Sequence, residues 1–173
     1  MNSEKIIESG MTFGSFPVGN YFHIEKSKTY ANIQDNVKIA EFLLLRHKQG
    51  SPVVWIIEAK SSSPRPETKQ NFDDFINEIS NKLVNAFSLG VASILKRHTF
   101  AENELSPQFK GLDLVETGFK FVLIINGHRE EWLAPLLDAL NNVLQPTIKT
   151  WALDPMAVAV LNENGARKFG LVK

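Results

Sequence analysis

The chain has 173 residues, of which 43% are hydrophobic and 22% are charged, and its formal net charge at pH 7 is zero. This length suits a single domain, residues 1–173, with a hydrophobic core, and the composition argues against disorder. Zero net charge removes the simple electrostatic argument for a nucleic-acid-binding protein, and the lack of cysteine excludes disulfides and thiolate metal sites. Any metal must be held by oxygen or imidazole, which favours hard cations such as Mg²⁺ or Mn²⁺.

The sequence also bears on where the protein works. No apolar stretch approaches the roughly 20 residues that a membrane-spanning helix requires. The first ten residues, MNSEKIIESG, lack the basic and apolar segments of a signal peptide. We therefore expect a cytoplasmic protein with no membrane partner.

The first part of the chain predicts loops followed by three strands. Glycine and proline up to residue 20 indicate loops and short extended pieces around an early helical turn at residues 4–8. Residues 21–27 and 37–46 are expected to be strands, because they alternate or are rich in apolar and β-branched side chains. A short turn containing Gly50 then leads to a third strand at residues 53–60, which must be an antiparallel neighbour of the second.

The second part predicts a long helix and then alternating strands and helices. Apolar residues recur every three or four positions along this amphipathic helix, which follows a loop rich in serine and proline and has a potential bend at Gly90. The recurring residues are Phe72, Phe75, Ile76, Ile79, Leu83, Phe87, Val91, Ile94 and Leu95. The elements expected after the helix are a strand at 119–127, a helix at 130–144 and a strand at 156–162. This order predicts an α/β fold with a mixed central β-sheet flanked by helices.

Two glutamates at the ends of adjacent strands are the strongest functional signal. If the hairpin closes on Gln49 and Gly50, the register places Glu41 directly opposite Glu58, with Cβ atoms about 5 Å apart and Lys60 on the same face. Two carboxylates at that separation repel each other by about 3 kcal/mol at an effective dielectric constant near 20. A divalent cation would reverse the sign of this interaction, because both carboxylates would become ligands.

The residue types at this position suggest different roles for the acids and for the lysine. The paired acids would hold the metal, and the lysine would hold a water or stabilise charge on a phosphate oxygen. The structural alternative is a simple salt pair of Glu58 and Lys60 at the rim of a sheet. If the acid pair carries no cation, Glu58→Ala is expected to stabilise the protein.

The hairpin resembles the PD-(D/E)xK nuclease superfamily, whose motif is an acid in one strand followed by acid, any residue and lysine in the next. The resemblance covers residues 20–127 and implies a restriction-endonuclease-like fold and hydrolysis of phosphodiester bonds with Mg²⁺ or Mn²⁺. It implies Glu41, Glu58 and Lys60 as catalytic residues, with Glu41, Glu58 and the backbone carbonyl of Ala59 as metal ligands. The stretch IAEF contains no Pro-Asp, so the assignment of Glu41 depends on the register as much as on the motif.

Further positions remain open within this resemblance. Asp35 is a rival for the first acid, although IQDN is more typical of a turn. Glu8 and Glu25 are candidates for a third acid, and Gln70 is a candidate for a polar residue contributed by the helix. The four histidines show no metal-ligand spacing, and most of them are expected at the surface. His128 and Arg129, which follow an apolar strand, are an open alternative as a phosphate contact.

The resemblance implies a nucleic acid as the partner, with DNA as the first expectation and RNA left open. A homodimer, or a complex with another protein, is a further possibility. The competing hypothesis is a nuclease-like fold that does not cut and serves as a nucleic-acid-binding or protein-interaction module.

Overall fold

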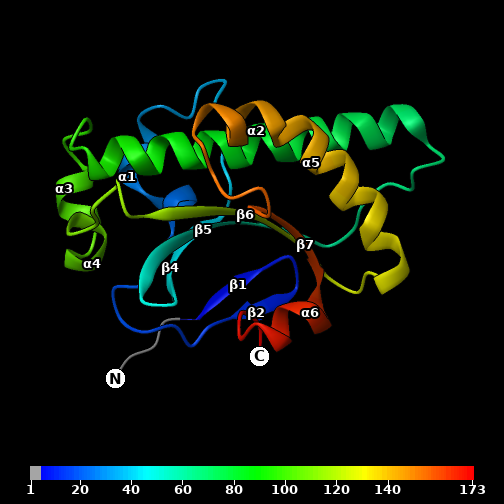
Figure 1. The fold of residues 1–173 in the computed structure, drawn as a ribbon, viewed down its shortest axis with the longest axis horizontal. Coiled ribbons are helices and arrows are strands. Elements are labelled where there is room, and N and C mark those ends of the chain that lie inside the picture. The colour runs from blue at the N-terminus through cyan, green and yellow to red at the C-terminus, as the bar shows by residue number, and fades with distance from the viewer. Residues whose placement is uncertain (1–4) are drawn as a thin grey trace.

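The computed structural model describes residues 5–173 and contains a five-stranded mixed sheet (Figure 1). Its strands, in spatial order, are β3 (Tyr21–Phe22), β4 (Phe42–Lys48), β5 (Ser51–Lys60), β6 (Gly118–Ile125) and β7 (Val158–Asn162). The first three strands are antiparallel neighbours, and β5, β6 and β7 are parallel. The predicted mixed α/β architecture is therefore confirmed.

Each face of the sheet is covered by different elements (Figure 1). The long helices α2 (Lys69–Ile94) and α5 (Leu133–Thr150) pack on one face. The hairpin of β1 (Ile6–Glu8) and β2 (Met11–Phe13) packs on the other face with α6 (Glu163–Lys168). The remaining short helices are η1 (Ile24–Lys26), α1 (Lys28–Ala31), α3 (Ala101–Glu104), α4 (Pro107–Lys110) and η2 (Glu130–Trp132).

The β4–β5 hairpin has the predicted register. Lys48 is paired with Ser51 and Phe42 with Ile57, so the turn consists of Gln49 and Gly50. Both turn residues have positive φ, 52° and 88°, as a two-residue turn between right-twisted strands requires. The ladder ends at Phe42 and Ile57, so Glu41 and Glu58, expected directly opposite each other, are not a pair of this ladder. The backbone N–H of Glu41 donates instead to the carbonyl of Ile57 at 3.0 Å, which keeps Glu41 next to the end of the hairpin.

Helix α2 confirms the predicted apolar period. Phe72, Ile76, Ile79, Leu83 and Phe87 are all buried against the sheet. Gly90 lies inside α2, and the helix continues through it to Ile94. No helix in the described part of the chain is both long and apolar enough to cross a bilayer.

Several element boundaries differ from the sequence-based expectation. Residues 6–8 form strand β1 rather than a helical turn, because Ser9 and Gly10 turn the chain back onto β2; residue 4 lies outside the described part. The strand expected at 21–27 ends at Phe22, and residues 37–41 lie outside any strand. Helix α5 continues beyond 144 to Thr150 and carries Pro146 in its interior.

The break after Phe22 has a local cause. The hydroxyl of Ser27 accepts a hydrogen bond from the N–H of Tyr30 at 3.0 Å and donates to the carbonyl of Ile24 at 2.7 Å. Serine at this position caps the next helix and competes with extended backbone. This capping turns the chain away from the sheet and places η1 beside Glu41, whose carbonyl accepts from the N–H of Glu25 at 3.3 Å.

Candidate functional site

The structure brings Glu41 and Glu58 together at one end of the β4–β5 hairpin. Glu58 lies on the face of β5 that α2 covers, with Val54 and Ile56, and has no exposed surface. Glu41 is 7% exposed, and the charge of Glu58 is one of the causes that raise its pKa. Each glutamate has one buried carboxylate oxygen, Oε2, without a hydrogen-bond partner among residues 5–173.

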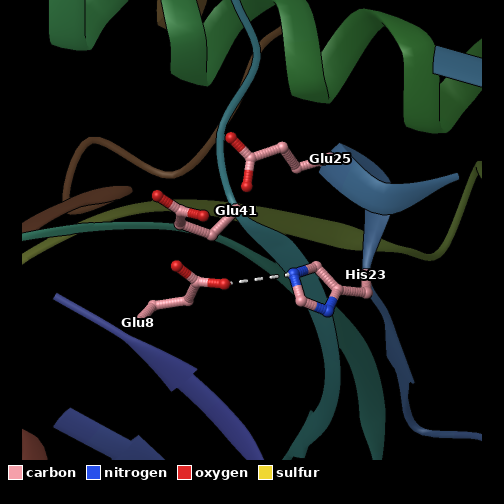
Figure 2. Close-up of side chains that lie close together, drawn as sticks. All are labelled: Glu8, His23, Glu25 and Glu41. Atoms are coloured by element: carbon pink, nitrogen blue, oxygen red, sulfur yellow. Dashed lines mark ion pairs between the residues drawn. The ribbon is translucent and has the colours of Figure 1, made fainter. Parts of the chain in front are cut away.

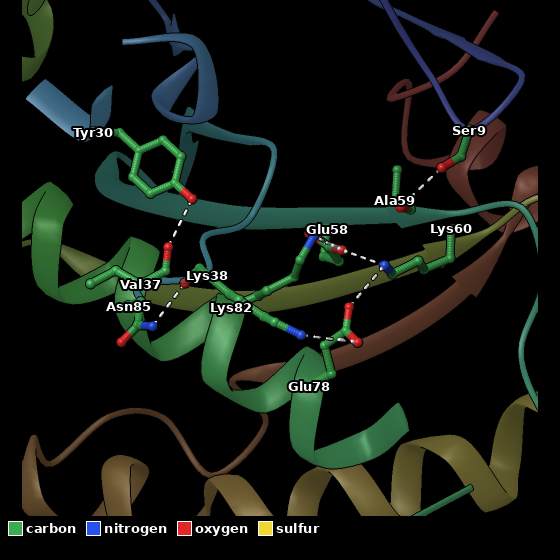
Figure 3. A network of polar contacts seen from close by, with 10 residues as sticks. All are labelled: Ser9, Tyr30, Val37, Lys38, Glu58, Ala59, Lys60, Glu78, Lys82 and Asn85. Carbon is green, nitrogen blue, oxygen red and sulfur yellow. Dashed lines mark hydrogen bonds and ion pairs between the residues drawn. The ribbon is translucent and has the colours of Figure 1, made fainter. Parts of the chain in front are cut away.

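Two ammonium groups neutralise Glu58 (Figure 3). The Nζ atom of Lys82 lies 2.8 Å from Oε1 of Glu58, and the Nζ atom of Lys60 lies 3.4 Å from the same oxygen. Burial raises the pKa of Glu58, and the charges of Lys82 and Lys60 oppose that rise. Lys60 also contacts Oε1 of Glu78 at 3.4 Å, so it lies between two carboxylates.

Lys82 and Glu78 were missed by the sequence reasoning, although a signal existed. Lys82 lies directly before the buried Leu83 on the apolar stripe of α2, and Glu78 lies one turn before it. A charged residue so close to a buried stripe needs a partner in the facing sheet. The strand acid Glu58 is that partner.

Glu41 has the most strongly shifted acidity at the site. Its pKa is raised from the ordinary value of 4.5 to about 9 by burial, by a hydrogen bond with Glu25 and by the charges of Glu58, Glu25 and Glu8. At neutral pH, and without a bound cation, its carboxyl is therefore protonated. A cation bound at this position would favour the ionised form.

A second group of ligand atoms surrounds Glu41 (Figure 2). One ligand atom each of Glu8, His23, Glu25 and Glu41 lies within 4.8 Å of the others. The Nε2 atom of His23 is 3.6 Å from Oε1 of Glu8. These residues come from β1, the segment after β3, η1 and the residue before β4, so only the folded chain assembles them.

The donor set fits a divalent cation. Three carboxylates and an imidazole are ligands that Mn²⁺ and related metals accept. Glu41 is buried and its Oε2 atom has no hydrogen-bond partner among the described residues, so a cation would supply the interaction that this oxygen lacks. Both candidates for a third acid, Glu8 and Glu25, lie in this group. His23 was not among the sequence candidates, but it is two residues from Glu25 in the segment predicted as a strand, a spacing that suggests a shared face.

Three other sequence candidates lie outside these contacts. The carbonyl of Ala59 accepts a hydrogen bond from the hydroxyl of Ser9 at 3.0 Å, next to Glu8 in the chain. The side-chain amide of Gln70 is exposed and donates to Asp74 on the same helix at 2.9 Å. Asp35 is exposed in a turn and is not one of the grouped ligands.

A cavity of about 370 Å³ lies beyond the carboxyl ends of β5 and β6. It is lined by Ser63, Arg65, His128 and Trp132, among others. The hydroxyl of Ser63 is 3.3 Å from Nε2 of His128, and burial lowers the pKa of this histidine. Ligands of open α/β sheets commonly bind in the crevice outside the carboxyl ends of the strands.

Comparison with protein-family models, with curated proteins and with solved structures found no match. The structure by itself defines an α/β protein with a five-stranded mixed sheet, and one end of that sheet carries a buried group of acids with adjacent lysines.

Proposed function

We propose that this protein is a metal-dependent nuclease of the restriction-endonuclease-like fold. The observation that carries the proposal is the position of Glu41 and Glu58 at the end of an antiparallel hairpin that continues into a helix and a parallel strand, where Lys60 lies 3.4 Å from Glu58 and the charge of Glu58 raises the pKa of Glu41. The resemblance to the PD-(D/E)xK superfamily implies these three residues as the catalytic set. The raised pKa of Glu41 supports it, because a cation would relieve the crowding of acids.

In this mechanism the chain binds the cation through Glu41, with Glu58 on one side and Glu8, His23 and Glu25 on the other. When bound, the metal supplies Lewis acidity to a phosphate oxygen. Of the two lysines that contact Glu58 within residues 5–173, Lys60 is the more exposed, with 27% of its side chain accessible, compared with 14% for Lys82. We assign to its ammonium the task of orienting the attacking water.

The reaction is hydrolysis of a phosphodiester. The oxygen of the water bonds to phosphorus, and one P–O ester bond breaks. The products are a phosphate monoester on one fragment and a hydroxyl on the other, which takes up the proton. The cavity beyond β5 and β6 supports an approach of the nucleic acid from that side. The guanidinium groups of Arg65 and Arg129 lie 5.8 and 5.0 Å from the centre of the Trp132 ring, and a combination of cations and an aromatic ring suits the phosphates and bases of a nucleic acid.

Cleavage by the Lys60→Ala variant tests this function. The purified protein should cleave DNA or RNA when Mg²⁺ or Mn²⁺ is added and stop when EDTA is added. Lys60→Ala should abolish cleavage while it keeps the circular dichroism spectrum of the parent and a cooperative thermal transition. The matched control is Lys69→Ala, because Lys69 is 86% exposed and pairs with Asp73 on its own helix. Full cleavage by Lys60→Ala, or none by the parent with either metal, refutes the proposal.

A specific observation favours a second candidate, a nuclease-like fold that binds partners without cutting. The ammonium of Lys82 already lies 2.8 Å from the fully buried Glu58 and supplies the positive charge that a metal would supply. Calorimetric titration with Mn²⁺ separates the two candidates. A metal-dependent enzyme binds the ion and loses binding in Glu41→Gln, whereas a protein in which lysines take the place of the metal does not bind it.

A further inference from the structure

A larger cavity, of about 590 Å³, lies at the opposite end of the sheet from the acids. It is lined by residues at the beginning of β5 and β6, where Val53 pairs with Gly118. Strand β7 begins only at Val158, opposite Phe121, and this leaves space beside the first residues of β6. Glu58 and Lys60 lie at the other end of β5, so this cavity is distinct from the candidate nuclease site.

Basic side chains outnumber acidic ones in its lining. Arg46, His47, Lys48 and Lys120 line the cavity together with one acid, Asp154. The carboxylate of Asp154 accepts a hydrogen bond from the N–H of Met156 at 2.8 Å. Within residues 5–173, no ion pair links any of the basic lining residues to an acid.

Two of these cations lie over the same aromatic ring. The Cζ atom of Arg46 is 4.9 Å from the centre of the Trp55 ring, and the Nζ atom of Lys120 is 5.2 Å from it. Burial lowers the pKa of Lys120, the charge of Lys48 lowers it further, and Asp154 opposes both effects. Crowded and partly dehydrated cations of this kind are relieved by a concentrated negative charge, which a phosphate provides.

The remaining wall is apolar and unusually exposed. Trp151 packs edge-on against Phe87 with ring centres 4.9 Å apart, yet 51% of Trp151 is exposed. Met156 and Phe169, which also line the cavity, are 77% and 47% exposed. Exposed apolar groups around a concave site mark a binding surface, and a half-exposed indole can stack on a planar ring.

We propose that this cavity binds a nucleotide, with its phosphate held by Arg46, Lys48 and Lys120 and its base against Trp151. The volume lies within the range of about 300 to 1,000 Å³ that is usual for small-ligand sites. A nucleotide matches both parts of the lining, because its phosphate suits the basic residues and its base suits the exposed apolar ones. An acidic peptide would also need an extended groove or a long free strand edge. The proposal does not depend on nuclease activity.

Tryptophan fluorescence tests the proposal. The Trp132→Phe variant retains Trp55 and Trp151, which both line the cavity. Titration of this variant with ATP should change its emission and saturate well below about 1 mM, while adenosine and inorganic phosphate should each bind at least about tenfold more weakly. Added in the same background, Lys120→Gln and Lys48→Gln should each weaken ATP binding about tenfold, and Lys69→Gln should leave it unchanged.

The effect of Trp151→Ala separates the two halves of the site. It should weaken ATP binding and leave the weak binding of inorganic phosphate unaltered, with the folded circular dichroism spectrum retained. Absence of saturable ATP binding overturns the proposal, and so does binding that neither lysine variant weakens. Saturation by a glutamate-rich peptide in place of ATP also overturns it and assigns the surface to a protein partner.

Discussion

The ammonium of Lys82 on α2 lies 2.8 Å from the carboxylate of Glu58 on β5, and this pair joins the longest helix to the centre of the sheet. The glutamate has no exposed surface and the lysine side chain is 14% exposed. Removal of one partner of such a pair leaves a buried charge without compensation. The pair is therefore both a packing constraint and a competitor for any metal at Glu58.

Lys82→Met is expected to lower the free energy of unfolding and raise the affinity for Mn²⁺. The loss should be about 2 kcal/mol in the metal-free protein, less than for a fully broken buried pair because Lys60 remains 3.4 Å from Glu58. Chemical denaturation with and without Mn²⁺ measures both effects. The control Lys69→Met should change stability by about 0.5 kcal/mol or less. Unchanged Mn²⁺ affinity in Lys82→Met would contradict competition between the lysine and the metal.

Glu58→Ala is expected to destabilise the metal-free protein. The sequence suggested stabilisation, on the premise of an acid pair without a cation, but Lys82 and Lys60 already neutralise Glu58. Loss of the carboxylate leaves the largely buried ammonium of Lys82 without its closest partner and also creates a cavity. Thermal melting in EDTA should show a lower midpoint than in the parent. A higher midpoint would mean that repulsion between the acids outweighs these ion pairs.

Glu41→Gln is expected to stabilise the metal-free protein increasingly as the pH rises. The folded pKa of Glu41, about 9, exceeds the ordinary value of 4.5, so the folded state binds more protons than the unfolded state between these values. Stability contributed through this group is therefore lost as pH rises from about 4.5 to about 9.

Denaturation of the parent and Glu41→Gln across that pH range measures the difference. It should be small near pH 4.5 and reach about 2 kcal/mol or more near pH 8. A difference that stays constant with pH would show that Glu41 titrates normally in the folded protein.

His23→Ala is expected to reduce affinity for Mn²⁺ more than affinity for Mg²⁺. Imidazole is a better ligand for Mn²⁺ than for Mg²⁺, and His23 lies with Glu8, Glu25 and Glu41 in the group of ligand atoms. Calorimetry should show a loss of about tenfold for Mn²⁺. His98→Ala, which changes a histidine outside the group, serves as the control. Equal losses for the two ions would remove His23 from the metal ligands.

Gly90→Ala is expected to destabilise the protein by about 1 kcal/mol, although alanine is the better helix former. An added Cβ would lie 2.8 Å from Cδ1 of Leu43, which is itself 2% exposed and has little room to move. Urea denaturation measures the change. A gain of about 1 kcal/mol would show that Leu43 adjusts without cost and that only helix propensity matters.

The sequence determined the elements whose signals are local and periodic. The Gln49–Gly50 turn fixed the register of β4 and β5 as far as Phe42 and Ile57, because each turn type permits one pairing. The three-to-four residue period of α2 and the apolar runs of β5 and β6 gave the mixed sheet and its helices. The local signal was weaker between residues 5 and 41, where the Ser9–Gly10 turn and the Ser27 cap redirected the chain.

Only the tertiary structure decided which distant residues join the site. No sequence motif includes Lys82, Glu78 or His23. Their contacts join a helix, a sheet and an N-terminal hairpin, and such contacts depend on how those elements pack. The same packing left Gln70 exposed to solvent and brought Glu8 and Glu25 to Glu41. A pattern along the chain specifies which face a side chain occupies, but burial and the charges brought from other elements set its acidity and its partners.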